Sequence, residues 1–307
     1  MMLISSAARS ERETRSAFAF NRAVAVLSGL AVAFGFIEHD PSKAARLRID
    51  LDNLDCPASI TRSVFGGDAE VVTRSILKSL RSKPGTVPTF FFLDPYGHPL
   101  PIPLLRELIA IPKAEVLVNL MWFRISMDLA NPDRTEHLDY LFGHDKWREQ
   151  RFNQLSGPAR ETAFVEYFEQ EVNAPYRLHQ AMPYSPEDKV GIRDTQTKYY
   201  LVHFSSHPSA ANAMKPVMKR AEKALARLRR TAEQMPSDFA DPRKESIAEL
   251  KSALCDQFGA GKQLSFGDLL DDTANMRNVE PEFRKALKEL ELEGKIKIDR
   301  RESSAMA

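Results

Sequence analysis

Three acidic residues, Glu38, Asp68 and Asp94, each follow a short run of residues that is typical of a β-strand. In a doubly wound sheet, ligands bind outside the carboxyl ends of the strands, and a carboxylate after the second strand commonly accepts hydrogen bonds from a ribose. Glu38 suits this ribose contact, and Asp68 suits the amino group of adenine. The alternative is that these acids cap the helices that follow them, because a helix N-terminus attracts carboxylates. The sequence leaves both roles open.

The turn Asp94-Pro95-Tyr96-Gly97 directly follows the most strand-like run of the chain, residues 89–93. It resembles the catalytic turn of amino-methyltransferases, where polar groups hold an exocyclic amine beside the methyl donor and an aromatic ring stacks on the base. In that role Asp94 accepts a hydrogen bond from the amine and Tyr96 stacks, with Pro95 between them. The second proline of the usual Asp-Pro-Pro-Tyr is absent, so a plain tight turn is the alternative.

Asn119, Trp122 and Arg124 follow the next predicted strand and are candidates to line a substrate pocket at the same edge of the sheet. Packing against the following helix is the alternative for each of them. No metal site is expected, because His203 and His207 straddle a strand end and a loop. The two cysteines, Cys56 and Cys255, have no neighbour at metal-ligand spacing.

Strand and helix patterns alternate along the chain from residue 21 to residue 235. This alternation predicts an α/β fold with a doubly wound, Rossmann-like sheet. Residues 131–195 carry no strand signal and predict a helical insertion into that domain. Residues 1–20 are polar and without periodicity, and we expect them to be disordered.

Residues 243–300 contain three short helical patterns, 247–258, 266–270 and 281–292, and an alternating segment, 295–298, that is typical of a strand. These are the parts of a winged-helix domain. Its last helix supplies three candidate contacts for nucleic acid, which are Arg284, Lys285 and Lys288. Acidic residues alternate with them, so a protein partner is as well supported as DNA.

The composition argues against a bulk attraction to nucleic acid, since 43 Lys and Arg against 42 Asp and Glu give a formal net charge of +1. Any nucleic-acid site must therefore be a local patch. The apolar run Ala23–Phe36 is too short and too interrupted to span a bilayer. We expect a cytoplasmic protein without a membrane segment.

Five motifs occur together in an order that resembles the three-Cys-motif partner proteins (TcmP), a bacterial family. They are Phe36–Glu38, Phe91–Gly97, Glu115–Asn119, Leu141–Trp147, and Tyr199–Val202 with His207-Pro208 and Met214-Lys215. The resemblance implies a class I methyltransferase-type sheet, S-adenosylmethionine as the ancestral cofactor and a C-terminal winged helix. Glu38 and Asp68 would then bind the cofactor. The implied partner is a three-Cys-motif protein that looks like a radical-SAM enzyme.

One departure from the family matters for the cofactor. Family members begin with a strand and a glycine-rich loop that brings backbone amides against the cofactor's methionine moiety, whereas the only glycines before Glu38 are Gly29 and Gly35. Either the start of the fold lies upstream of Met1 or the first strand is missing, and cofactor binding should be weak or lost.

Two hypotheses follow. The first is a methyltransferase-like protein that acts on or binds nucleic acid together with a partner protein, inactive in this form if the cofactor loop is lost. The second is a non-catalytic scaffold or adaptor whose winged helix binds DNA or the partner.

Overall fold

The computed structural model divides the chain into two compact units, Met1–Ala211 and Asn212–Ala307. It describes residues 2–6, 31–82, 87–94, 100–183, 197–232, 247–259 and 261–299. The first unit is a sheet with helices and the second is helical, and each is treated below by itself.

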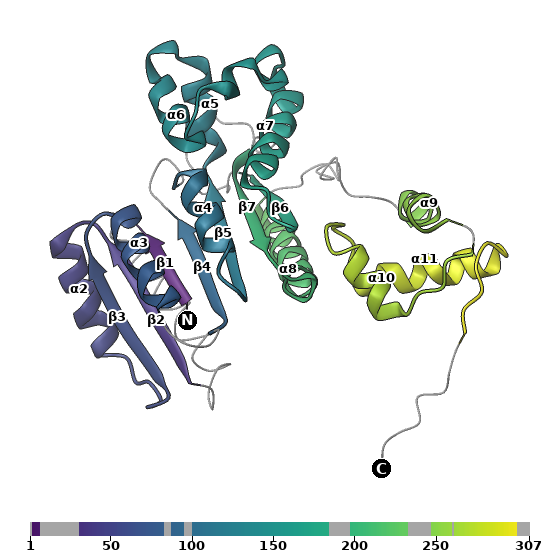
Figure 1. Cartoon of the computed structure of the whole chain (residues 1–307), viewed down its shortest axis with the longest axis horizontal. Coiled ribbons are helices and arrows are strands. Elements are labelled where there is room, and N and C mark those ends of the chain that lie inside the picture. Colours follow the sequence, from purple (N-terminus) through teal and green to yellow (C-terminus); the bar gives the residue numbers. More distant parts are fainter. Residues whose placement is uncertain are drawn as a thin grey trace. The chain divides into compact units, whose positions relative to one another are not determined.

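A seven-stranded sheet forms the centre of the first unit, in the order β3-β2-β1-β4-β5-β7-β6 (Figure 1). The strands are β1 (Met2–Ser6), β2 (Val32–Glu38), β3 (Ile60–Gly66), β4 (Thr89–Asp94), β5 (Ala114–Leu120), β6 (Tyr176–Pro183) and β7 (Thr197–Ser205). Strands β1 to β5 pair in parallel, and β7 is antiparallel to both of its neighbours. The predicted mixed α/β fold with a mostly parallel sheet is confirmed.

The first strand of the fold lies within the chain. Met2–Ser6 pairs with β2 on one side and with β4 on the other, at the centre of the sheet. The expectations that the first strand is missing and that residues 1–20 are disordered are therefore wrong for these five residues. Their strand pattern is too short to stand out in the sequence, and the two neighbouring ladders supply the pairing. Residues 7–20 lie outside the described part of the chain.

Helices pack on both faces of this sheet. They are α2 (Pro41–Asp52), α3 (Ala69–Arg81), α4 (Ile102–Ile109), α5 (Trp122–Ala130), α6 (Thr135–Phe142), α7 (Gly157–Val172) and the start of α8 (Pro208–Ala232). The main core joins Ile37 to strands β4 and β5 and to helices α3, α4 and α7. A smaller cluster joins Phe36 to Leu51 of α2. Because successive strand residues point to opposite faces, the two clusters cover the two sides of the sheet.

The predicted insertion at 131–195 is helical only in part. Its described residues contain α6, α7 and three short 3₁₀ turns, η1 (Pro132–Arg134), η2 (Lys146–Glu149) and η3 (Arg151–Gln154). They also contain β6, which the sequence analysis missed. This strand pairs only with β7, at the edge of the sheet. It carries polar residues such as His179 and Gln180 inside its apolar pattern, so its periodicity is weak.

The second unit contains α8 from Asn212 onward and three further helices. These are α9 (Ile247–Phe258), α10 (Phe266–Asp272) and α11 (Glu280–Leu292), as the sequence predicts. Leu250, Leu254, Phe283 and Leu290 are buried in their shared core. The division between the units falls within α8, whereas the sequence analysis predicts it after residue 235. The predicted linker lies outside the described residues.

The predicted strand at 295–298 does not form. Gly294 adopts a φ of 71°, and Lys295 N–H donates to the Leu290 carbonyl at 3.0 Å, which closes the end of α11. Ile296 packs on the helical core instead. An alternating segment needs a partner strand, and the described residues of this unit provide none.

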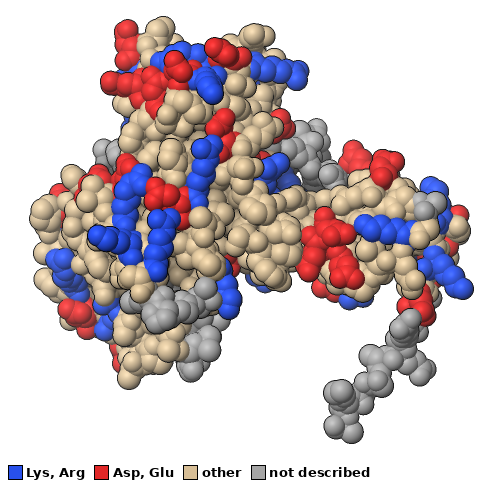
Figure 2. All heavy atoms as spheres, in the orientation of Figure 1, with Lys and Arg blue, Asp and Glu red and all other residues tan. Residues whose placement is uncertain are grey.

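None of the described helices is both long enough and apolar enough to cross a membrane. The last residues of the apolar run that ends at Phe36 belong to β2, a strand of the sheet. Lys and Arg side chains are interspersed with Asp and Glu side chains over the visible surface of both units (Figure 2).

Candidate functional site

Polar residues line up across the carboxyl ends of four neighbouring strands. Glu38 stands opposite Gly66, and the pairing of Ser5 with Ile37 places Ser6 beside Glu38. Ser6 in turn stands opposite Asp94. The register therefore forms one row of polar positions at the edge where doubly wound folds bind ligands. Ser6 was missed by the sequence analysis because its strand was missed.

Asp94 and Asn119 meet at one end of this row. The pairing of Leu93 with Val118 brings them side by side, and Asn119 Nδ2 donates to Asp94 Oδ1 at 2.5 Å. Asn119 is only 8% exposed, yet its Oδ1 accepts no hydrogen bond from the described residues. A buried acceptor without a donor is costly, so the site has an unused capacity to accept an N–H or O–H group.

Glu38 is buried and holds the turn that follows β2. Its Oε1 accepts from the Asp40 N–H at 2.9 Å, and its carbonyl accepts from the Gly67 N–H at 3.1 Å. Its second carboxylate oxygen has no partner among the described residues. Asp40 caps α2, and its hydrogen bonds, first from the Ser42 hydroxyl and then from backbone N–H groups, lower the pKa of that carboxyl. One Glu38 carboxylate oxygen therefore has no partner among the described residues, whereas the Asp40 carboxylate caps α2.

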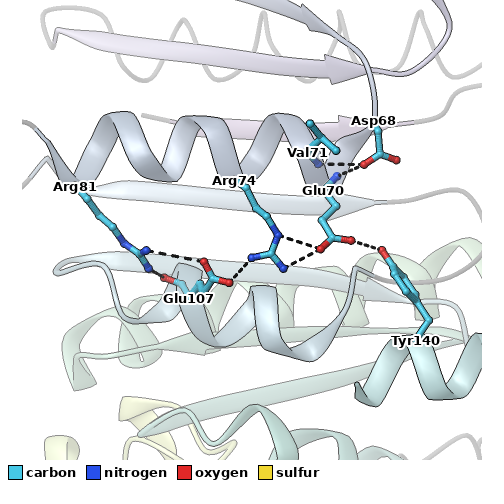
Figure 3. A network of polar contacts seen from close by, with 7 residues as sticks. All are labelled: Asp68, Glu70, Val71, Arg74, Arg81, Glu107 and Tyr140. Carbon is cyan, nitrogen blue, oxygen red and sulfur yellow. Dashed lines mark hydrogen bonds and ion pairs between the residues drawn. The ribbon is translucent and has the colours of Figure 1, made fainter. Parts of the chain in front are cut away.

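Asp68 takes the capping role that the sequence left open. Its Oδ1 accepts from the backbone N–H groups of Glu70 and Val71, both at 3.0 Å (Figure 3). The preceding Gly67 has a φ of 131°, a left-handed conformation that favours glycine. Asp68 Oδ2 is not used by the cap and the residue is exposed. Capping and ligand contact are thus compatible, because they need different oxygens.

A polar network links α3 to α4 and α6 (Figure 3). Glu70 Oε1 accepts from Arg74 Nε and Nη2 at 3.0 and 2.8 Å, and Glu70 Oε2 accepts from the Tyr140 hydroxyl at 2.6 Å. Arg74 also pairs with Glu107, which lies 3.9 Å from Arg81. The Glu70 carboxylate is therefore fully engaged and is no candidate for ligand binding.

Burial, and then the hydrogen bond to Glu70, raises the pKa of Tyr140, so this phenol remains a neutral donor. The sequence shows Glu70 and Arg74 at helical i,i+4 spacing. It gives no signal for Tyr140, which lies 70 residues further along the chain.

The other residues predicted for this edge are Trp122, Arg124, Pro95 and Tyr96. Trp122 is 8% exposed and packs on Phe164 with ring centroids 5.5 Å apart, which fits the packing alternative rather than a pocket. Arg124 is half-buried in the first turn of α5. Pro95 and Tyr96 lie outside the described residues, so the Asp94 turn is defined only at Asp94.

The predicted nucleic-acid residues belong to α11 in the second unit. Arg284 pairs with Glu280 at 2.6 Å and lies over the Phe266 ring at 4.3 Å. Lys285 and Lys288 are exposed and pair with no acid in the described part of the chain.

Two acids of α11, and Glu293 at its C-cap, pair with lysines of other helices. Glu282 pairs with Lys219 of α8, and Glu289 and Glu293 pair with Lys251 of α9. Lys285 and Lys288 are thus exposed on α11, while Glu282 and Glu289 pair with lysines of other helices.

The Leu141–Trp147 motif closes the helical insertion rather than a site. Gly143 ends α6 with a φ of 74°, and a Cβ there would lie 3.0 Å from Pro103. Trp147 Nε1 donates to Asp139 at 2.8 Å, and His144 Nε2 lies 3.2 Å from Glu171. The motif is explained by packing and hydrogen bonding between α4, α6 and α7.

Two histidines that pair with glutamates, His179 and His203, were not predicted as a site from the sequence. His203 is fully buried, with Nε2 3.0 Å from Glu115, at the opposite end of β5 from the polar row. His179 Nδ1 lies 2.5 Å from Glu169. Within the described ranges, no group of three or more His, Cys, Asp or Glu residues could hold a metal ion.

Comparisons with models of known protein families, with curated proteins and with solved structures gave no match for this chain. The fold and the site define a mostly parallel α/β protein with a polar row at the carboxyl edge of its sheet.

Proposed function

We propose that this chain is a methyltransferase-like protein, ancestrally dependent on S-adenosylmethionine, that acts on or binds nucleic acid together with a partner protein. The strand order β3-β2-β1-β4-β5-β7-β6 supports this, because the class I methyltransferase type of sheet has the same order with the same reversed strand β7. The observation that carries the proposal is the Asp94–Asn119 pair at the carboxyl edge, with an unused buried acceptor.

Each residue of the row has a role in this proposal. The free oxygen of Glu38 accepts from the ribose hydroxyls, and Asp68 Oδ2 accepts from the adenine amino group. Asp94 and Asn119 hold an exocyclic amine of the substrate, on which Tyr96 would stack. The cofactor would supply the methyl group. The chain's own residues bind and orient the two reactants.

The residues present fit only part of the cofactor. Glu38 and Asp68 suit the nucleoside, but no glycine occurs between Met1 and Ser28 to let backbone amides approach the methionine moiety. We therefore expect weak binding that depends chiefly on the nucleoside contacts.

Calorimetric titration with S-adenosylmethionine and with adenosine tests the cofactor assignment. Asp68→Asn keeps an Oδ1 that can cap α3 but replaces the free acceptor with a donor. It should lower the affinity for both ligands about tenfold, since a hydrogen bond to a charged group contributes about 1.5–3 kcal/mol. Asp40→Asn, the same change at the cap of α2, is the matched control and should have no effect. Absence of heat with either ligand would refute the cofactor assignment.

A second candidate function is a non-catalytic scaffold or adaptor whose C-terminal helical unit, predicted from the sequence to be a winged helix, binds DNA or the partner. It is favoured by the unpaired Lys285 and Lys288 on α11. For DNA, fluorescence anisotropy with a duplex should show affinity that falls steeply with salt, and Lys285→Gln with Lys288→Gln should reduce that salt slope by about two. If the two substitutions left the affinity and its salt dependence unchanged, α11 would be excluded as the DNA-binding surface.

The expected partner is a three-Cys-motif protein that resembles a radical-SAM enzyme. A pull-down between the purified proteins, with and without the Lys285→Gln and Lys288→Gln changes, would show whether α11 serves the partner rather than DNA. Retention that does not change would assign the contact to another surface.

A further inference from the structure

Three exposed aromatic side chains belong to segments on the carboxyl side of the sheet in the first unit. Among the described large apolar side chains, the exposed aromatic ones are Phe65, Phe123 and Tyr140, with exposed fractions of 38%, 41% and 48%. The other exposed large side chains are aliphatic or methionine. Exposed rings along the ligand-binding side of a doubly wound sheet are candidates to contact a ligand.

The fold places all three beside the polar row. Phe65 precedes Gly66, the residue opposite Glu38. Phe123 lies in the first turn of α5, which begins directly after β5 and Asn119. Tyr140 is held to the first turn of α3 through Glu70, next to the Asp68 cap (Figure 3).

Tyr140 is fixed in this position although almost half of it is exposed. Its hydroxyl donates to Glu70 at 2.6 Å, and Glu70 is held in turn by Arg74. A ring that is anchored by its hydroxyl loses little further freedom when a flat ligand stacks on it. The anchor explains why an exposed tyrosine here can serve a ligand rather than only packing.

The unused acceptor at the edge is an independent observation. Asn119 is more than nine-tenths buried, and its Oδ1 has no donor among the described residues. The Asp94 carboxylate lies directly beside it. A ligand that satisfies both features needs a flat face for the rings and an edge that bears N–H groups. Nucleobases have both, and their edges are free only when they are unpaired.

We propose that this edge binds single-stranded nucleic acid, with unpaired bases stacking on Phe65, Phe123 and Tyr140 and one base donating an N–H to Asp94 and Asn119. The choice of nucleic acid rests on the proposed function. The binding itself requires no cofactor, so the nucleic-acid proposal and the cofactor assignment can fail separately. An extended apolar protein segment is the competing occupant. Its backbone N–H groups would also suit the acceptor pair, but it has no series of flat faces for the three rings.

Anisotropy with two fluorescein-labelled oligonucleotides of equal length, one with mixed bases and one abasic, tests the proposal without S-adenosylmethionine. The full chain should bind the mixed-base strand at least tenfold more tightly than the abasic strand or a blunt duplex. Phe65→Leu, Phe123→Leu and Tyr140→Leu keep apolar volume but remove the stacking ring. Each should weaken mixed-base binding about tenfold and leave abasic binding unchanged.

Ile49→Ala and Val87→Ala, at exposed aliphatic residues away from this edge, are the controls and should change nothing. Equal affinity of the unmodified chain for the mixed-base and abasic strands would overturn the proposal, and this comparison needs no variant to fold. Retention of base-dependent binding in the leucine variants would also overturn it. Loss of stacking would leave the adenosine titration unaffected, so the result separates this site from the cofactor site.

Discussion

The carboxyl edge of the sheet and the region of α11 use their acidic side chains in different ways. At the carboxyl edge of the sheet, one carboxylate oxygen of Glu38 and one of Asp68 accept backbone hydrogen bonds. The other oxygen of each has no partner among the described residues. On α11, by contrast, Glu282 and Glu293 pair with lysines of neighbouring helices. The difference separates acids that hold a fold together from acids that remain able to bind.

Pairing lowers the pKa of these acids in the second unit. Burial alone would raise the pKa of Glu282, but the bonds from Lys219 and the Val279 N–H outweigh it and leave the pKa lowered. The bond from Lys251 lowers the pKa of Glu293. Lys215 is the exception in this unit, because it is buried while its nearest opposing charge, Asp271, gives only partial compensation.

The largest expected effect tests whether the units are independent. Phe283 is fully buried in the helical core, so Phe283→Ala should cost that unit about 3–5 kcal/mol. Calorimetry of the whole chain should show one transition moving to lower temperature while a second stays in place. A joint shift of all transitions would show that the two units unfold together.

The second largest effect on the free energy of unfolding is expected at Lys215, where a substitution should stabilise the unit rather than destabilise it. Burial lowers its pKa from 10.5 to about 8, so the unfolded chain binds more protons between these values. The stability of the unit should therefore rise with pH from about 8 to 10.5, by up to about 3 kcal/mol.

Lys215→Met should remove this slope and raise the free energy of unfolding at pH 7. Part of the gain is offset because the Thr273 carbonyl loses its donor at 3.0 Å. Urea titrations of both proteins at pH 7 and pH 9.5 measure the difference. A slope that persists in Lys215→Met would assign it to other groups.

Asn119→Leu should separate stability from binding at the carboxyl edge. The change removes a buried acceptor that no described residue satisfies, which stabilises the fold, but it also takes the Nδ2 donor away from Asp94 Oδ1. The two effects oppose each other, so the free energy of unfolding should change by less than about 1 kcal/mol. Mixed-base oligonucleotide affinity should fall about tenfold at the same time. Thermal unfolding and anisotropy on the same sample measure both. A clear loss of stability would mean that Asn119 is structural.

The smallest effect concerns the acids of α11. Glu282→Gln should cost about 0.5–1 kcal/mol after allowance for solvent screening. Because the folded pKa of Glu282 is lowered below 4.5, its contribution is present above that value and is lost as pH falls through the folded pKa. Urea titrations at pH 7 and pH 3 should show the two proteins converging in acid. A difference that is independent of pH would point to packing instead.

The sequence predicted those elements whose signals are local. The apolar run predicts β4, and the capping residue Asp68 predicts the helix that follows it. It missed β1 and β6 because the first is short and the second lies at an edge with polar residues inside it. It also predicted a strand at 295–298 from alternation alone, where the described residues offer no neighbouring strand.

What the sequence by itself determined is the set of carboxylates that follow the strands, because strand ends and helix caps depend on neighbouring residues. Which of these carboxylates remain free was decided only by the tertiary structure. Asp94 meets Asn119 across 25 residues and Glu70 meets Tyr140 across 70. Such contacts depend on strand register and helix packing, which no local pattern encodes.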